Sequence, residues 1–254
     1  MSKTNLSKLK LGWMLSPRSG VNSRDRDVLE GLQPHPNIKE LEIENYPGAE
    51  FPSWMQMGDP LSSFPKLVKL RLRYLKNVEE WSLDWNENDN LPALQYLELF
   101  CCDQLKSLPA QLCNLTSLKS LSITFCDSLS SLPRELSRLT LLETLHIGWC
   151  PCLESLPELG MQEQKSCIRS LVIDDCKELS SRLEGLQYLT SLESLELKKC
   201  PKLKLSTHDL EHLSALKTLK VDSPIDLPEF MEGRVSVTVI SNDSPGRWVI
   251  RNED

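Results

Sequence analysis

Residues 118–133 of the chain read LKSLSITFCDSLSSLP, and residues 142–157 repeat the same pattern as LETLHIGWCPCLESLP. In each stretch leucine or isoleucine fills the first, fourth and sixth positions, cysteine fills the ninth, and a Leu-Pro pair closes the stretch. The second stretch begins 24 residues after the first. Such a fixed offset between similar segments indicates an internal structural repeat.

The Leu-x-x-Leu-x-Leu part of this pattern recurs over most of the 254 residues. With Ile, Val or another apolar residue allowed in a leucine position, nine segments begin at Leu6, Ile38, Leu67, Leu94, Leu118, Leu142, Ile168, Leu192 and Leu216. Leucine accordingly makes up 48 of the residues, whereas an ordinary enzyme core spreads its bulk over several apolar types. These are leucine-rich repeats, and each must stack on the next because one repeat cannot bury its apolar face alone.

The repeats predict an α/β fold, namely a leucine-rich repeat solenoid curved like a horseshoe. Each Leu-x-Leu segment is expected to be a parallel strand on the concave face, with its leucines inward and the residues between them outward, because strand side chains alternate. Short helical or irregular segments are expected on the convex side, at residues 111–115, 135–139, 184–189 and 208–213. Polar insertions at residues 16–27 and 81–90 are predicted to be loops.

The domain organisation predicted from these patterns is a solenoid of about nine units over residues 1–233, followed by a C-terminal cap or tail over residues 234–254. Residues 234–240 alternate in a strand-like way, residues 241–246 resemble a turn, and residues 248–250 form a second apolar run. We therefore expect a β-hairpin that covers the last coil, since a solenoid needs a capped end.

Nine cysteines are present, and five of them occupy the same position of the repeat: Cys102, Cys126, Cys150, Cys176 and Cys200. Cysteine is a small residue that is readily buried, so this row is predicted to be structural and reduced. The Cys150-Pro-Cys152 pair has no second pair of ligands to complete a zinc site. The His-x-x-Glu-His order at residues 208–212 falls on a predicted convex segment. We expect neither a metal nor a cofactor.

Several function classes are disfavoured by the sequence. The net charge of −7 argues against a general nucleic-acid binder, because binding phosphates needs a basic surface. No apolar run is long enough to span a bilayer. Glycine-rich nucleotide-binding motifs do not occur in the sequence, and the four histidines have no placed nucleophile or acid beside them. The chain is therefore predicted not to be an enzyme.

A protein-binding site is predicted on the concave face. Between the second and third leucines the outward row reads Lys10, Glu42, Arg71, Glu98, Ser122, His146, Val172, Glu196 and Lys220, and the residues just after the third leucine include Trp13, Tyr74, Phe100, Phe125 and Trp149. Aromatic anchors are enriched at binding hot spots. The candidate site comprises Tyr74, Phe100, Phe125, His146, Trp149, Arg71 and Glu98. Two alternatives remain open: the rings pack over the sheet edge, and the charged rows pair with one another across strands.

One region resembles a known family. Residues 29–41 read LEGLQPHPNIKEL and residues 46–54 read YPGAEFPSW. These stretches, together with the repeats that carry cysteine and a Leu-Pro pair, resemble the leucine-rich repeat region of plant disease-resistance proteins of the coiled-coil, nucleotide-binding, leucine-rich repeat class. The resemblance extends from Leu6 to about Glu229.

The resemblance implies a cytoplasmic immune receptor whose repeats sense a pathogen effector, directly or through a guarded host protein, and restrain a nucleotide-binding module. The predicted partner is thus a protein: an effector, a guarded host protein, or the nucleotide-binding module of the same receptor. The P-loop of that module is not in this sequence, so we expect a receptor fragment. The alternative is a general intracellular leucine-rich repeat scaffold without an immune role.

Overall fold

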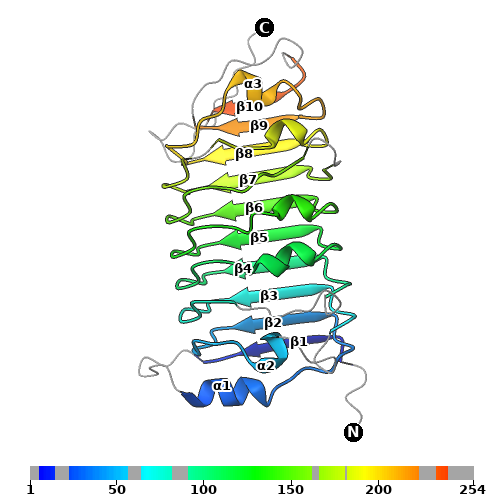
Figure 1. Ribbon diagram of the computed structural model, residues 1–254, viewed down its shortest axis with the longest axis vertical. Coiled ribbons are helices and arrows are strands. Elements are labelled where there is room, and N and C mark those ends of the chain that lie inside the picture. Colours follow the sequence, from blue (N-terminus) through cyan, green and yellow to red (C-terminus); the bar gives the residue numbers. More distant parts are fainter. Residues whose placement is uncertain are drawn as a thin grey trace.

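The computed structural model describes residues 6–14, 23–56, 64–81, 91–161, 166–180, 182–222 and 233–239. Ten strands lie in one sheet, in chain order, and every neighbouring pair is parallel (Figure 1). They are β1 (Lys8–Gly12), β2 (Glu40–Glu44), β3 (Lys69–Arg73), β4 (Tyr96–Phe100), β5 (Ser120–Thr124), β6 (Thr144–Gly148), β7 (Ser170–Asp174), β8 (Ser194–Lys198), β9 (Thr218–Val221) and β10 (Ser236–Val239). This order confirms the predicted solenoid.

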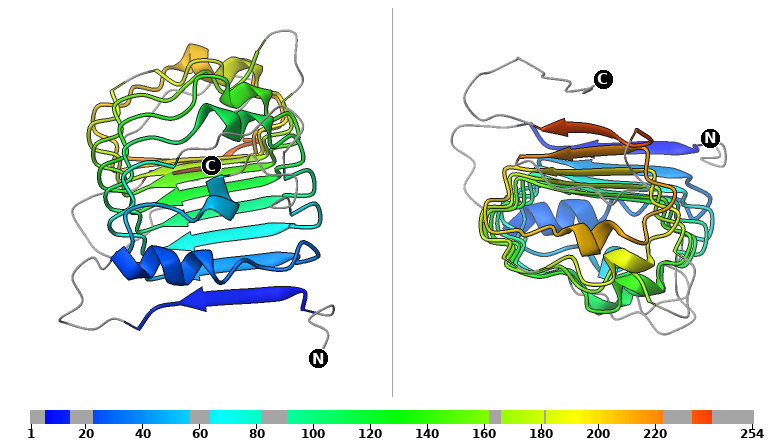
Figure 2. Two further views of the ribbon diagram at one scale, coloured as in Figure 1. Left: turned by 60° about the horizontal axis from the view of Figure 1, so that its bottom comes forward. Right: turned by 90° about the horizontal axis from the view of Figure 1, so that it is seen from above.

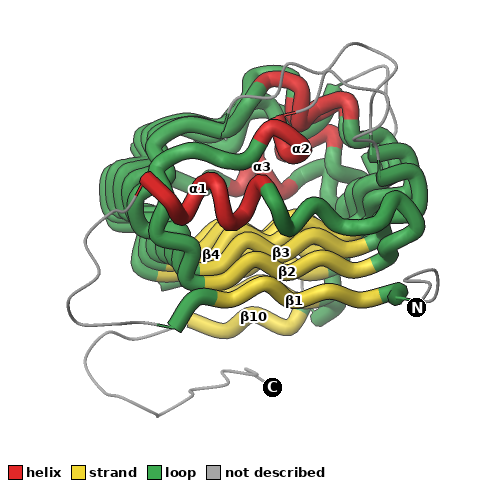
Figure 3. Tube along the Cα trace, turned by 90° about the horizontal axis from the view of Figure 1, so that it is seen from below, coloured by secondary structure: helices red, strands yellow, loops and turns green. Residues whose placement is uncertain are grey.

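Short helices occupy the side opposite the sheet (Figures 2 and 3). They are α1 (Ser23–Glu30), α2 (Ser53–Gln56), the 3₁₀ helices η2 (Ala110–Asn114), η3 (Leu136–Arg138) and η4 (Leu186–Tyr188), and α3 (Thr207–Leu210). The helical turns expected at four positions of the return segments are confirmed. None of the described helices has the length and apolar character needed to cross a bilayer.

The two predicted loop insertions need correction where they are described. Residues 23–27 form the first part of α1, because Leu29 at the end of that helix is fully buried and holds the helix against the core. Trp81, expected to begin a loop, is 5% exposed and packs against Phe51 with ring centroids 5.7 Å apart. Residues 16–22 and 82–90 lie outside the described residues.

The core lies between the sheet and the return segments, and stacked leucines build it. Leu97, Leu121 and Leu145 are partners in adjacent strands and are each no more than 1% exposed. Burying one such side chain contributes about 1.5–3 kcal/mol relative to leaving it exposed. Because each coil contacts mainly its two neighbours, the stability of the solenoid is close to a sum over coils and the interfaces between them.

The five cysteines of the repeat form a buried row beside the strand ends, as predicted. Their thiols donate to carbonyl oxygens two residues earlier: Cys150 to Gly148 at 3.3 Å and Cys200 to Lys198 at 3.1 Å. A hydrogen bond with the neighbouring Cys126 thiol, together with burial, raises the pKa of Cys150 to about 12. Thiolate is the reactive form of cysteine, so Cys150 is chemically unreactive in the folded protein.

This chemistry predicts the order of thiol labelling. Cys152 is exposed, whereas the five row cysteines are buried, and hydrogen bonds between neighbouring thiols together with burial raise the pKa of Cys126, Cys150, Cys176 and Cys200. With iodoacetamide at neutral pH we expect Cys152 to be alkylated first, and the five row cysteines only after unfolding in urea. Peptide mapping by mass spectrometry measures the order. Labelling of Cys126 or Cys150 as fast as Cys152 in the native protein would contradict it.

The C-terminal strand extends the sheet. Residues 236–239 pair with β9 in parallel, with Val237 beside Leu219. A strand of the predicted hairpin cap would not need to pair in parallel with β9. The alternation of Val237 and Val239 fits a further coil of the solenoid equally well. The second arm, at residues 248–250, lies outside the described residues. The hairpin and the boundary at residue 233 remain predictions.

Candidate functional site on the outer face of the sheet

The outward side chains of the ten strands form one surface, here called the sheet face. The predicted outward row is present in register from β1 to β9: Lys10, Glu42, Arg71, Glu98, Ser122, His146, Val172, Glu196 and Lys220 are successive cross-strand partners. The sequence therefore identified correctly which residues face outward and which of them are neighbours.

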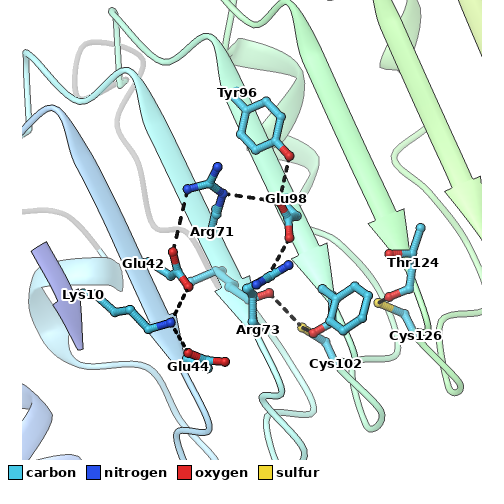
Figure 4. Close-up of polar contacts among 12 residues, drawn as sticks. Lys10, Glu42, Glu44, Arg71, Arg73, Tyr96, Glu98, Cys102, Thr124 and Cys126 are labelled. Atoms are coloured by element: carbon cyan, nitrogen blue, oxygen red, sulfur yellow. Dashed lines mark hydrogen bonds and ion pairs between the residues drawn. The ribbon is translucent and has the colours of Figure 1, made fainter. Parts of the chain in front are cut away.

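Charged side chains at the β1–β4 end of the sheet face pair with one another (Figure 4). Glu98 is only 8% exposed, accepts a hydrogen bond from Arg73 Nε at 2.8 Å, and lies 3.4 Å from Arg71 Nε. Tyr96 donates its hydroxyl to the same carboxylate at 2.7 Å. Hydrogen bonds with Glu44 and Glu42 raise the pKa of Lys10. Cross-strand pairing is confirmed, and the candidate residues Arg71 and Glu98 contact each other.

Aromatic rings at the same end are covered by cations of the chain itself. Lys69 Nζ lies 4.9 Å from the centre of the Tyr96 ring, and the Arg71 guanidinium lies 5.5 Å from it. The Arg73 guanidinium lies 5.2 Å from the centre of the Phe100 ring. Both the charges and the ring faces at β3 and β4 thus have partners within the fold.

The middle of the sheet face is different, because its side chains are small and mostly uncharged. This central patch consists of the outward residues of β5, β6 and β7: Ser120, Ser122, Thr124, Thr144, His146, Gly148, Ser170, Val172 and Asp174. Gly148 is buried, and the position that a Cβ would occupy there lies 3.3 Å from His146 Nε2, 3.4 Å from the carbonyl oxygen of Asp174 and 3.6 Å from Thr124 Cγ2, so the space is already filled. Burial lowers the pKa of His146.

An aromatic ladder borders the central patch along the ends of the strands. It consists of Tyr74, Phe100, Phe125 and Trp149, whose successive ring centroids are 5.2, 5.3 and 4.7 Å apart. The last pair is stacked with an angle of 5° between the ring planes. Phe125 is 36% exposed. The structure thus brings the four predicted aromatic residues into one row, and the rings both pack on one another and remain partly open to solvent.

The ladder residues come from two positions of the repeat, whereas the sequence analysis grouped them as one. Phe100 is the last residue of β4, but Tyr74, Phe125 and Trp149 follow their strands with φ of +56°, +58° and +50°. In that conformation the N–H of Trp149 donates to the carbonyl of Asp174 on the next strand at 2.7 Å. Left-handed backbone favours Asn, Asp or Gly, and bulky side chains are uncommon there. Backbone preference therefore does not explain the aromatic rings.

Asp174 is a residue of this surface that sequence reasoning did not single out. It is the cross-strand partner of Gly148, and its Oδ1 is buried without a hydrogen-bond partner. Burial raises the pKa of its carboxyl group. No sequence signal distinguishes Asp174 from the other acidic residues of the strands, because only the three-dimensional arrangement shows that its Oδ1 lacks a hydrogen-bond partner.

Parts of the chain are similar to a known family of leucine-rich repeats and to two named proteins. Residues 1–83 match the family of R13L1/DRL21 leucine-rich repeats. Over 98 residues, 39% of the chain, it is 36% identical to two proteins of Solanum bulbocastanum named "Putative disease resistance protein RGA4" and "Putative disease resistance protein RGA1". The match spans 9% of the length of each of these relatives.

Two solved structures share the fold. The leucine-rich repeat domain of the type III effector XopL superposes with a TM-score of 0.61 and 21% identity, over 89% of this chain and 77% of that domain. The Leptospira interrogans leucine-rich repeat protein LIC12759 gives a TM-score of 0.53 and 22% identity, over 80% of this chain and 49% of that protein. At such identities the likeness establishes the fold alone. The fold is thus that of a leucine-rich repeat solenoid, and residues 1–83 are similar to R13L1/DRL21 leucine-rich repeats.

Proposed function

We propose that the sheet face binds a protein, with the aromatic ladder and the central patch at the centre of the interface. The observation that carries the proposal is the placement of Phe125 and Trp149 in left-handed backbone, where a small polar residue is the easier choice. Residues whose side chains are unfavourable for the local backbone conformation are typical of functional sites. Large rigid rings lose little entropy on binding and are common interface anchors.

The proposal extends to a biological setting. We place the chain in a cytoplasmic plant immune receptor, where it senses a pathogen effector or a guarded host protein, or contacts the nucleotide-binding module of the same receptor. The match to the two disease-resistance proteins supports this setting. The candidate residues Tyr74, Phe100, Phe125, His146 and Trp149 form the contact surface. Arg71 and Glu98 lie at the rim of this surface. When a partner binds, its charged groups replace the ion pair between these two residues, and this replacement affects specificity more than affinity.

The double variant Phe125→Asn, Trp149→Asn tests this proposal. Asparagine is native to the same backbone position at Asn45, with φ of +57°, so the variant keeps a suitable backbone residue while it removes both rings. We expect the melting temperature to change by only a few degrees, because the lost ring stacking is offset in part by the better backbone preference. Partner binding should weaken about tenfold or more, as for truncated hot-spot anchors.

Pull-down from plant cytosol with quantitative mass spectrometry gives the measurement, followed by titration of each differential protein in purified form. The matched control is Leu141→Asn, because Leu141 is 47% exposed but lies outside the sheet face. The proposal stands if specific proteins are lost from the double variant and retained by the control. It fails if both variants bind the same proteins as the wild type, or if the double variant unfolds.

A further inference from the structure

The aromatic ladder runs across the strands of the sheet and not along one of them. Its four rings come from the coils of β3, β4, β5 and β6, and successive ring centroids are 5.2, 5.3 and 4.7 Å apart. A segment of a partner protein that contacts all four rings must therefore lie along the axis of the solenoid. It cannot join the sheet as a further strand, because each of these strands already pairs with a neighbour on both sides.

The spacing of the rings restricts the conformation of such a segment. Two steps of the ladder cover about 10 Å. In a polyproline II helix, residues three apart point to the same side and lie about 9.3 Å from each other, close to this length. In an extended strand, the residues on one side are about 6.6 Å apart and fall out of step with the rings. An α-helix, with a pitch of about 5.4 Å, matches single steps of the ladder.

The polar groups of the ladder distinguish between these two kinds of helix. The hydroxyl of Tyr74 and the indole N–H of Trp149 make no hydrogen bond to any described residue, and neither group is buried. An indole N–H can only donate. A polyproline II segment leaves its carbonyl oxygens free to accept, whereas an α-helix uses most of its own within the helix. The available donors therefore favour a ligand in the polyproline II conformation.

The surface beside the rings favours a segment without charge. The outward residues of β5 and β6 are serine, threonine, histidine and glycine, with no lysine, arginine or carboxylate among them. Arg73 lies over Phe100, but no described lysine or arginine lies over the ring of Phe125 or Trp149. Proline suits this surface because it is uncharged and has no N–H that needs an acceptor.

From the ring spacing, the available donors and the uncharged surroundings we infer that the aromatic ladder binds a proline-rich segment of the partner protein in the polyproline II conformation. Prolines three residues apart lie against alternate rings, and carbonyl oxygens of the segment accept hydrogen bonds from Tyr74 and Trp149. Proline-rich segments bind well to aromatic side chains because their conformation is already formed before binding. This inference rests on the proposed function, since it specifies what the same surface binds.

Random peptides displayed on phage and selected on the folded chain test the inference. We expect the selected peptides to share two prolines three residues apart. Synthetic copies with alanine in place of both prolines should bind about tenfold more weakly, because alanine loses the ring contacts and the preformed conformation. Fluorescence anisotropy of the labelled peptides measures the affinities.

Tyr74→Phe tests the hydrogen bond while the aromatic ring stays in place. The variant removes only the hydroxyl, so we expect the selected peptides to bind it about twofold to tenfold more weakly than the wild type. Tyr188→Phe is the matched control, since Tyr188 lies in η4 on the side opposite the sheet. If the two variants bind the peptides equally well, the donor that favours polyproline II over an α-helix is not used and the inference fails.

The outcomes separate this inference from the proposed function. If the selected peptides lose affinity for Trp149→Asn but share no such prolines, or tolerate alanine at both, the surface binds protein and the polyproline II site is wrong. If they bind the wild type and the double variant Phe125→Asn, Trp149→Asn equally well, both ideas fail. The alanine exchange changes only the peptide, so it decides the question even if a variant chain unfolds.

Discussion

Replacing Trp54 with alanine is expected to lower the free energy of unfolding by about 3–5 kcal/mol, the usual cost of deleting a large buried ring. Trp54 in α2 is 1% exposed, and its ring packs edge-on against Phe64 with centroids 6.0 Å apart. Its Nε1 donates to the carbonyl of Leu29 in α1 at 3.0 Å. One side chain therefore joins the return segments of the first coils.

The loss of stability should be concentrated in the coils around Trp54, because coils contact mainly their neighbours. Hydrogen exchange measured by mass spectrometry should show faster exchange over residues 23–56 than over β7 and β8, and urea titration gives the overall loss. Trp54→Phe is the control: it keeps most of the buried volume and gives up the hydrogen bond, at about 1–2 kcal/mol. Equal losses in the two variants would show that the hydrogen bond, and not the packing, dominates.

Leu145→Ala is expected to cost about 2–5 kcal/mol, because it opens a cavity in the middle of the stacked core. Leu145 is 1% exposed and lies between Leu121 and Leu171 of the neighbouring strands. Leu145 lies in a central coil, so the substitution weakens the contacts of this coil with both neighbouring coils. The parts of the solenoid on either side should then unfold at different urea concentrations, which broadens the unfolding transition. Circular dichroism during urea unfolding measures both effects.

The same coil supplies the control for that experiment. Leu141 is 47% exposed, and Leu141→Ala should change the free energy of unfolding by less than about 0.5 kcal/mol. The comparison holds the residue type and the coil constant and varies only burial. A similar loss from both variants would argue against the inward register that places Leu145 in the core.

Much of the fold could be predicted from the sequence because apolar residues recur at the same positions of each repeat. The alternation of leucines fixed which residues of each strand face inward, and the repeat spacing fixed which residues become partners, as with Ser122, His146 and Val172. The buried cysteine row followed from the same spacing. The first coils were harder, since their longer inserts lack the regular pattern: the first part of α1 and the buried Trp81 were both expected to be loop.

The candidate site was predictable only in part. Its aromatic residues could be named, but sequence spacing did not show that Phe100 ends a strand while Phe125 and Trp149 adopt positive φ. Neither could it show that Arg73 already covers Phe100, or that Asp174 Oδ1 is buried without a hydrogen-bond partner. These properties depend on side-chain directions and on competition among neighbouring charges, which a linear pattern does not contain.

The position that follows each strand has a consequence for how such a protein can change. In the described part of the chain, seven non-glycine residues with positive φ occupy it, and all seven are of different types: Asn45, Tyr74, Cys101, Phe125, Trp149, Asp175 and Lys199. The backbone there is fixed by hydrogen bonds from its N–H to the next strand, as for Phe125 and Gly148 at 3.0 Å, and these bonds do not involve the side chain. If the sheet face binds a protein as proposed, single substitutions at this position would alter what it recognises while the coils stay in place, and new specificities could arise one residue at a time on an unchanged scaffold.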